Sequence, residues 1–343
     1  MNAPSHHRHG QVPRRGFIKA AGVGIALGAA GAAGLRLGGL GASPRGRWDP
    51  AAFPPPTRAR VAVLRAEGYE RDLETLVFEG LVEIGADVAG ARVFLKPNLV
   101  EFDPLRPINT DARLVAATAV ALRRLGAVQV TVGEAPGHRR DLQYVAEQAG
   151  LIDALASIDV PFVDLNTQPV RHVPLRTSYT PLAELWLPSP VVDADIVISM
   201  PKMKTHHWAG VTLSMKNCFG VLPGRIYGWP KNVLHWVGIE HSILDIAAAV
   251  RPDYAIVDGI VGMEGNGPIS GTAVDAGVVV VADDVVAADA VAATVMGVDP
   301  ASVGYLAEAG RFLGQIDRDL IDARGEDPDR LVRPFASPPV AVA

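Results

Sequence analysis

Cysteine and lysine are both scarce in this chain of 343 residues. The one cysteine, Cys218, excludes a disulfide within the chain and an iron–sulfur cluster held by the chain's own thiolates alone. Only six lysines stand against 26 arginines, so arginine carries most of the ordinary positive charge. Because a buried lysine can lose its proton and an arginine cannot, the places where this chain uses lysine point to possible chemistry.

Several classes of function are also excluded or disfavoured by what is missing. A formal net charge of −5 without a long basic run gives no electrostatic case for nucleic-acid binding. The sequences G-K-[ST], H-E-x-x-H, paired C-x-x-C and G-x-S-x-G are all absent, so the common phosphate-loop, zinc-protease, zinc-finger and serine-hydrolase patterns do not apply. A hydrophobic content of 49% with 20% charged residues predicts a substantial core and argues against disorder.

The first 42 residues have the pattern of an export signal. Arg14 and Arg15, followed by F-I-K, precede a glycine-rich apolar run over 20–42 that is interrupted by Arg36. This arrangement resembles the twin-arginine signal, which implies passage of a folded protein through the twin-arginine export machinery. We expect residues 1–42 to be a removable signal, with retention as a membrane tether as the alternative. The protein is therefore expected in the periplasm, in the cell envelope or outside the cell.

Beyond this leader, proline-rich residues 43–59 predict a linker, residues 60–314 an α/β domain and residues 315–343 a polar tail. Short apolar strands alternate with helical periodicity, which indicates a mostly parallel sheet with helices on both faces. Two lobes with a crevice at the carboxyl ends of the strands are one possible arrangement. The expected strands are 61–64, 92–95, 128–132, 160–165, 195–199, 254–257 and 278–282, with a hairpin insertion over 170–187; the expected helices are 70–84, 109–125, 141–156, 230–250, 284–296 and 301–312.

The stretch 199–224 concentrates the candidate chemistry. It begins S-M-P-K-M-K-T-H-H-W directly after an apolar strand, and it contains Lys202, Lys204 and Lys216, three of the six lysines. A fourth, Lys96, occurs in K-P-N at the end of another expected strand. The stretch is either a solvated basic loop or a site that needs lysine chemistry.

Polar residues follow five of the expected strands: Lys96-Pro97-Asn98, Gly133-Glu134, Pro201-Lys202-x-Lys204, Asp258-Gly259 and Asp283-Asp284. Ligands of open α/β sheets bind outside the carboxyl ends of the strands, so this coincidence predicts a site. Lysines from two strands in one crevice suit a small anionic molecule.

Two further features carry alternatives. The glycine-rich stretch 258–271, which includes Gly265 and Gly267, is either a lid that clamps a ligand or a plain connection. His206, Asp258 and Glu264 could bind a divalent metal, although their spacing matches no strong metal motif. In the expected helix over 230–250, a polar stripe faces either solvent or the crevice; it consists of Lys231, His235, His241 and Asp245.

Five sequence blocks resemble the domain-of-unknown-function 362 family. They are K-P-N at 96–98, P-K-M-K-T-H at 201–206, T-L-S-M-K-N-C-F-G at 212–220, V-D-G-I-V-G-M-E-G-N-G-P at 257–268 and D-D-V-V-A-A-D-A at 283–290, within a likeness over roughly 60–312. Members are often labelled iron–sulfur proteins because some carry a cysteine-rich module, which this sequence lacks. The resemblance marks the matched positions as a site without assigning their roles: Lys96, Asn98, Lys202, Lys204, His206, Lys216, Asn217, Asp258 and Glu264.

The leading hypothesis is an exported enzyme that acts on a small anionic substrate. The candidate catalytic residues are Lys202, Lys204, His206 and Lys216; the candidate ligand-binding residues are Lys96, Asn98, Asn217, Gly265 and Gly267; and the candidate metal ligands are His206, Asp258 and Glu264. The competing hypothesis is a non-catalytic protein that binds an anion, a metal or a cofactor at the same place.

Overall fold

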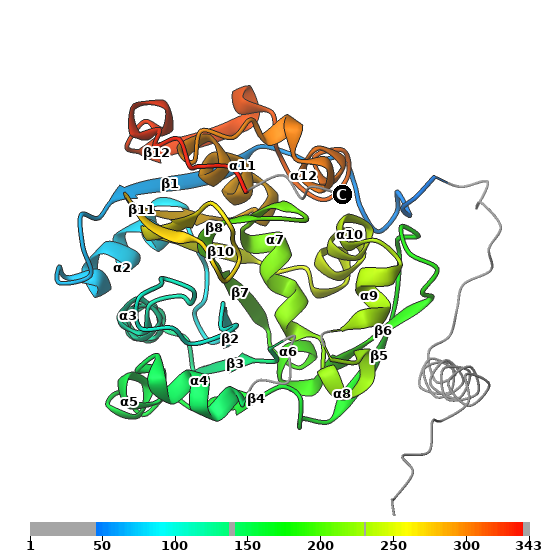
Figure 1. Ribbon diagram of the computed structural model, residues 1–343, viewed down its shortest axis with the longest axis horizontal. Helices are drawn as coiled ribbons and strands as arrows, with labels where there is room; N and C mark the ends of the chain where they lie inside the picture. The colour runs from blue at the N-terminus through cyan, green and yellow to red at the C-terminus, as the bar shows by residue number, and fades with distance from the viewer. Residues whose placement is uncertain (1–45, 137–140, 230, 339–343) are drawn as a thin grey trace, which may run out of the picture.

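The computed structural model describes residues 46–136, 141–229 and 231–338, and a ten-stranded sheet runs through them (Figure 1). Its main strand order is β12-β1-β11-β10-β7-β2-β3-β4, and a short strand β8 pairs with both β10 and β9. The strands are β1 (Ala59–Arg65), β2 (Arg92–Pro97), β3 (Gln129–Glu134), β4 (Phe162–Asp164), β7 (Ile196–Met200), β8 (Lys202–His206), β9 (Gly210–Thr212), β10 (Tyr254–Glu264), β11 (Thr272–Ala282) and β12 (Ile321–Gly325).

Helices cover both faces of the sheet, and each face has its own apolar core. Side chains alternate between the two cores along each strand, so Val61 and Val63 pack into one core while Ala62 packs into the other. The face with Ala62 carries α2 (Leu73–Glu83), α3 (Ala112–Arg124), α4 (Leu142–Gln148) and α5 (Leu151–Ala156). The face with Val61 and Val63 carries α7 (Ser214–Asn217), α10 (Ile239–Val250), α11 (Val285–Val295) and α12 (Gly304–Ala309). The predicted α/β class, with mostly parallel strands and helices on both faces, is confirmed. The main sheet is continuous over its ten strands.

The sheet also contains an antiparallel hairpin that the sequence analysis misjudged. Strands β10 and β11 pair antiparallel, with Asp258 beside Val279, so most of the glycine-rich stretch 258–271 belongs to a strand and its turn. Because β11 runs in the opposite direction to β10, its last residues lie where β10 begins, at the opposite end of the sheet from the carboxyl ends of the parallel strands. There Asp283 forms an ion pair of 2.7 Å with Arg60 at the start of β1. Asp283-Asp284 therefore lies away from the other four strand ends.

Segments on either side of the expected domain also join it. In the proline-rich region, Phe53 is buried and Trp48 stacks on Phe312 at 4.9 Å between ring centroids. In the expected tail, β12 pairs in parallel with β1, and Phe335 is buried. The predicted hairpin insertion is present as a separate two-stranded sheet of β5 (Val170–Pro174) and β6 (Glu184–Pro188).

The helix expected over 230–250 is divided. Gly238, with a φ of 102°, separates α9 (Asn232–Trp236) from α10. Both ends of the expected polar stripe are buried. Lys231 is buried before α9, and Asp245 is buried on α10, where it accepts hydrogen bonds from the backbone of Tyr179 and Thr180. The solvent-facing interpretation of these two residues is thus wrong. The remaining helices are α6 (Ser189–Val192) and α8 (Gly224–Tyr227), and among the described residues no helix is long and apolar enough to cross a membrane.

Candidate functional site

The stretch that follows β7 is a buried strand at the carboxyl edge of the sheet. Pro201 ends the pairing of β7, and β8 then takes its place beside β10, with Lys202 in register with Asp258. Lys202, Lys204 and His206 are at most 5% exposed, so the alternative of a solvated basic loop is wrong for this part of the stretch. Because side chains alternate along a strand, these three residues share one face of β8.

Lys202 is fully occupied by protein groups. Its ammonium forms an ion pair of 2.6 Å with Asp258 and also donates to the Tyr69 hydroxyl at 2.8 Å and to the Val261 carbonyl at 3.1 Å. The Tyr69 hydroxyl in turn donates to Asp258 at 2.7 Å. Three acceptors satisfy the three protons of an ammonium group, so this network holds the loop after β1 against β8 and β10.

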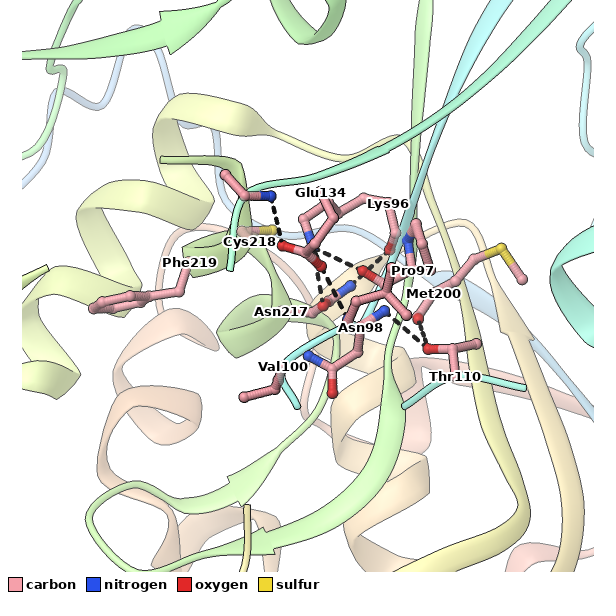
Figure 2. Close-up of polar contacts among 12 residues, drawn as sticks. Lys96, Pro97, Asn98, Val100, Thr110, Glu134, Met200, Asn217, Cys218 and Phe219 are labelled. Atoms are coloured by element: carbon pink, nitrogen blue, oxygen red, sulfur yellow. Dashed lines mark hydrogen bonds and ion pairs between the residues drawn. The ribbon is translucent and has the colours of Figure 1, made fainter. Parts of the chain in front are cut away.

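A second buried ion pair joins Lys96 at the end of β2 to Glu134 at the end of β3 (Figure 2). Both side chains are 1% exposed. Glu134 also accepts backbone hydrogen bonds from Leu99 at 3.1 Å and Ala135 at 2.9 Å, and Lys96 donates to the Pro97 carbonyl at 2.7 Å. The amide of Asn217 links this pair to α7, because its nitrogen donates to the Lys96 carbonyl at 2.8 Å. These contacts tie the ends of β2 and β3 and the helix α7 together around the buried pair.

Gly220 allows the chain to pass directly over this ion pair. A methyl group at Gly220 would overlap the Glu134 carboxylate and the Lys96 ammonium. We expect Gly220→Ala to lower the free energy of unfolding by about 1–3 kcal/mol, the usual cost of an overpacked interior. Urea denaturation measures this change. Gly68→Ala is the matched control, since no atom lies within 4 Å of the added methyl; an equal loss in both variants would contradict the close packing described here.

The other three buried or partly buried lysines form no ion pair with a carboxylate in the part of the chain that the structure describes. Lys204 donates to the Ile108 carbonyl at 2.8 Å, and Lys231 donates to the carbonyls of Ala135 and Phe219 at 2.7 and 2.6 Å. The Lys216 ammonium lies 4.3 Å from the ring centroid of Phe219, and no hydrogen-bond acceptor contacts it among the described residues. This ammonium is therefore available to a ligand.

Burial and mutual repulsion disfavour protonation of these three lysines. Burial, followed by repulsion from Lys202 and Lys216, lowers the pKa of Lys204 well below its ordinary value. Burial and then the charge of Lys96 lower the pKa of Lys216 to about 8, and burial lowers the pKa of Lys231 to about 7. Lys231 also adopts the left-handed backbone conformation, with φ of 67°, which is strained for any residue other than glycine.

Five of the six lysines of the chain thus lie at one edge of the sheet. They are Lys96, Lys202, Lys204, Lys216 and Lys231; we call them the lysine cluster, and the sixth, Lys19, lies outside the described residues. Two carboxylates pair with them, Glu134 and Asp258. A fully protonated cluster would leave three unpaired positive charges in a region of low dielectric constant, which a bound anion would compensate.

His206 is a neutral hydrogen-bond donor at this site. Its Nδ1 accepts the backbone N–H groups of Trp208 at 3.1 Å and Ala209 at 3.2 Å, so the neutral ring carries its proton on Nε2. Burial, followed by repulsion from Lys216, lowers the His206 pKa to about 2. The ring therefore stays neutral over the physiological range and offers an N–H group rather than a base.

The structure does not bring the candidate metal ligands together. Asp258 is engaged by Lys202 and Tyr69, while Glu264 accepts the backbone N–H of Ala336 at 2.8 Å. No group of three or more His, Cys, Asp or Glu side chains within the described ranges is arranged to hold a metal ion. The donor set at the cluster, dominated by lysine, does not suit a cation.

The candidate glycines and asparagines have different surroundings. Gly265 and Gly267 pack against β8, where the Thr205 hydroxyl donates to the Gly265 carbonyl at 2.9 Å and the His207 N–H donates to the Gly267 carbonyl at 3.2 Å. Asn98, by contrast, has a buried Oδ1 to which no described residue donates a hydrogen bond. Among the described residues, the buried hydroxyl oxygen of Thr212 also lacks a hydrogen-bond partner.

Three residues of the site were not among the candidates. Glu134 ends β3 and was recognised as one of five polar strand ends, yet it was given no role. Lys231 could have been found from the scarcity of lysine, but its helical periodicity placed it on a solvated stripe. Tyr69 lies in the loop after β1, and nothing in its sequence neighbourhood signals the contact with Asp258.

The profile of the domain of unknown function DUF362 matches residues 93–294. The chain belongs to this family. A thylakoid-associated protein of Synechocystis, sll1697, is 32% identical over 264 residues, which cover 74% of this chain and 79% of the relative. The residues matched by the family profile include every member of the lysine cluster.

Two solved structures align with part of this chain at low identity. The lactate racemase apoprotein from Thermoanaerobacterium thermosaccharolyticum aligns with a TM-score of 0.40 at 14% identity, over 66% of this chain and 55% of that one. A protein from Thermotoga maritima aligns with a TM-score of 0.36, also at 14% identity, over 57% of this chain and 52% of that one. This chain therefore spans only about half the length of either solved structure.

Proposed function

We propose that the lysine cluster binds a small anionic molecule and that the protein is an enzyme acting on it. The observation that carries this proposal is the imbalance of charge: three lysines at the carboxyl edge of the sheet lack a carboxylate partner among the described residues. Such an edge is the usual ligand site of α/β sheets. Structural ion pairs alone would not require the three additional lysines.

Lys216 is the candidate acid or base. Its pKa of about 8 lies near neutral pH, where a group can both accept and return a proton, and its ammonium has no acceptor among the described residues. Lys204, Lys216 and the Nε2–H of His206 would hold the anion. Lys96 and Lys202, already paired with carboxylates, would support the site by their charge and by fixing the strands.

The test separates catalysis from binding. The purified protein is incubated with a panel of small carboxylates and phosphate esters, and mass spectrometry records both bound ligand and chemical change. We expect wild-type protein to convert a member of the panel and Lys216→Met to lose more than about 100-fold in turnover, as for a lost acid or base. Binding without conversion of any member would favour the alternative of a non-catalytic anion- or cofactor-binding protein.

We also propose that the protein is exported by the twin-arginine route, on the basis of Arg14, Arg15 and the apolar run after them. These residues lie outside the described ranges. A reporter fused behind residues 1–45 should reach the far side of the membrane, and changing both arginines to lysine should abolish that transfer. Unchanged transfer in the double variant would rule out this route; a reporter that stays bound to the membrane would indicate a retained tether.

A further inference from the structure

Five aromatic rings lie in contact at the rim of the lysine cluster. His206 stacks on His207 at 5.0 Å between centroids, His207 contacts Trp208 at 4.7 Å, and Trp208 contacts His235 at 5.7 Å. His235 lies 5.5 Å from Phe219, the ring that the Lys216 ammonium faces. The series of rings therefore leads from solvent to the one lysine of the cluster that has no hydrogen-bond acceptor among the described residues.

Trp208 is the exposed member of this series. It is 64% exposed, although a tryptophan side chain gains substantial free energy from burial. The turn between β8 and β9 holds it there, because its own backbone N–H donates to His206 and the neighbouring His207 ring hydrogen-bonds the Gly267 carbonyl at 2.7 Å. An exposed indole that contacting rings link to the lysine cluster is suited to stack against a ligand of that cluster.

We infer that the anion bound by the lysine cluster carries a flat aromatic or heteroaromatic ring, which stacks on Trp208. The anionic group lies on the Lys216 ammonium and the Nε2–H of His206, and the ring extends toward solvent over the indole. This inference rests on the proposed function, because it specifies the ligand class of the same site. The imidazoles that flank Trp208 match a π-surface, whereas recognition of a sugar would require several hydrogen-bonding side chains around the indole.

Matched pairs of probes test this assignment. Benzoate is compared with cyclohexanecarboxylate, and phenyl phosphate with methyl phosphate, so that each pair shares its anionic group and differs in the ring. Calorimetric titration of the full chain should show the aromatic member binding roughly 5- to 100-fold more tightly, the range expected for stacking on an aromatic side chain. Trp208→Ala should remove this preference, and Trp208→Phe should restore part of it.

Trp236→Ala is the control, since Trp236 is 76% exposed and belongs to the same surface region but not to the series of contacting rings. Equal affinities within each pair, or a preference that survives Trp208→Ala, would overturn the aromatic assignment and leave the anion site intact. Tighter binding of glucuronate than of benzoate, lost in Trp208→Ala, would also overturn it and indicate a sugar acid. Failure of every probe, inorganic phosphate included, would contradict both this inference and the proposed function.

Discussion

Replacing Glu134 with alanine is expected to lower the free energy of unfolding by about 3–5 kcal/mol, the usual cost of breaking a buried ion pair. The change removes the partner of Lys96 and the acceptor of two backbone N–H groups, and it leaves the ammonium buried beside other lysines. For a protein of this size, each kcal/mol corresponds to roughly 1–2 °C in melting temperature, so thermal unfolding measures the effect readily.

The ion pair between Arg92 and Asp195 provides the control. Its side chains are 53% and 46% exposed, and Asp195→Ala should cost far less than Glu134→Ala because solvent screens an exposed pair. The double variant Lys96→Met, Glu134→Ala should recover part of the loss, since it removes the buried charge together with its partner. Comparable losses in the Glu134 and Asp195 variants would show that Lys96 and Glu134 are not a buried pair.

The affinity for an anion is expected to fall as pH rises through about 7–8. Lys231 and Lys216 have lowered pKa values of about 7 and 8 in the free protein, so both are protonated below this window and lose their protons above it. Sulfate is a suitable probe because its own charge stays constant over the range. Its affinity should decrease as pH rises through this window, by roughly tenfold per pH unit for each lysine that must be protonated to bind it.

Lys216→Met should weaken sulfate binding at pH 6.5 by at least about 30-fold, which corresponds to about 2 kcal/mol for a lost charge partner. Arg330→Met is a control of equal charge change, since Arg330 is 85% exposed and pairs with Asp327. Without sulfate, the lowered pKa of Lys216 has the opposite consequence for stability. The unfolded chain binds more protons between pH 8 and 10.5, so this lysine makes the free energy of unfolding rise with pH there. A sulfate affinity independent of pH and of Lys216 would contradict the account.

The fold was predictable to the extent that it depends on local pattern. Apolar strands such as Val93–Leu95 and the caps of the following helices are visible in the sequence, and they suffice for the α/β class. The direction of β11 was not predictable, because an antiparallel hairpin and a crossover to a parallel strand have the same apolar pattern. For this reason Asp283 was predicted at the carboxyl edge of the sheet, whereas it lies at the opposite edge, beside Arg60.

Part of the site was predictable for a different reason. Lysine is rare enough here that its positions alone identified four members of the cluster. Which lysines are paired and which are available depends on register and on contacts between distant segments. Lys202 pairs with Asp258 on the neighbouring strand, and Lys231 donates to the carbonyl of Ala135, 96 residues earlier in the chain. The tautomer of His206 depends on backbone N–H groups of the following turn and has no sequence signal.

The central claim is that Lys216 is an available lysine with a lowered pKa that meets an anion. With six lysines in the chain, their individual titrations can be followed by NMR after ¹³C labelling of the side chains, and the Lys216→Met variant assigns the signal. The account predicts that this signal titrates near pH 8 and moves to higher pH when sulfate or an aromatic anion is added. A Lys216 signal that titrates near its ordinary value of 10.5, unchanged by any anion, would contradict it.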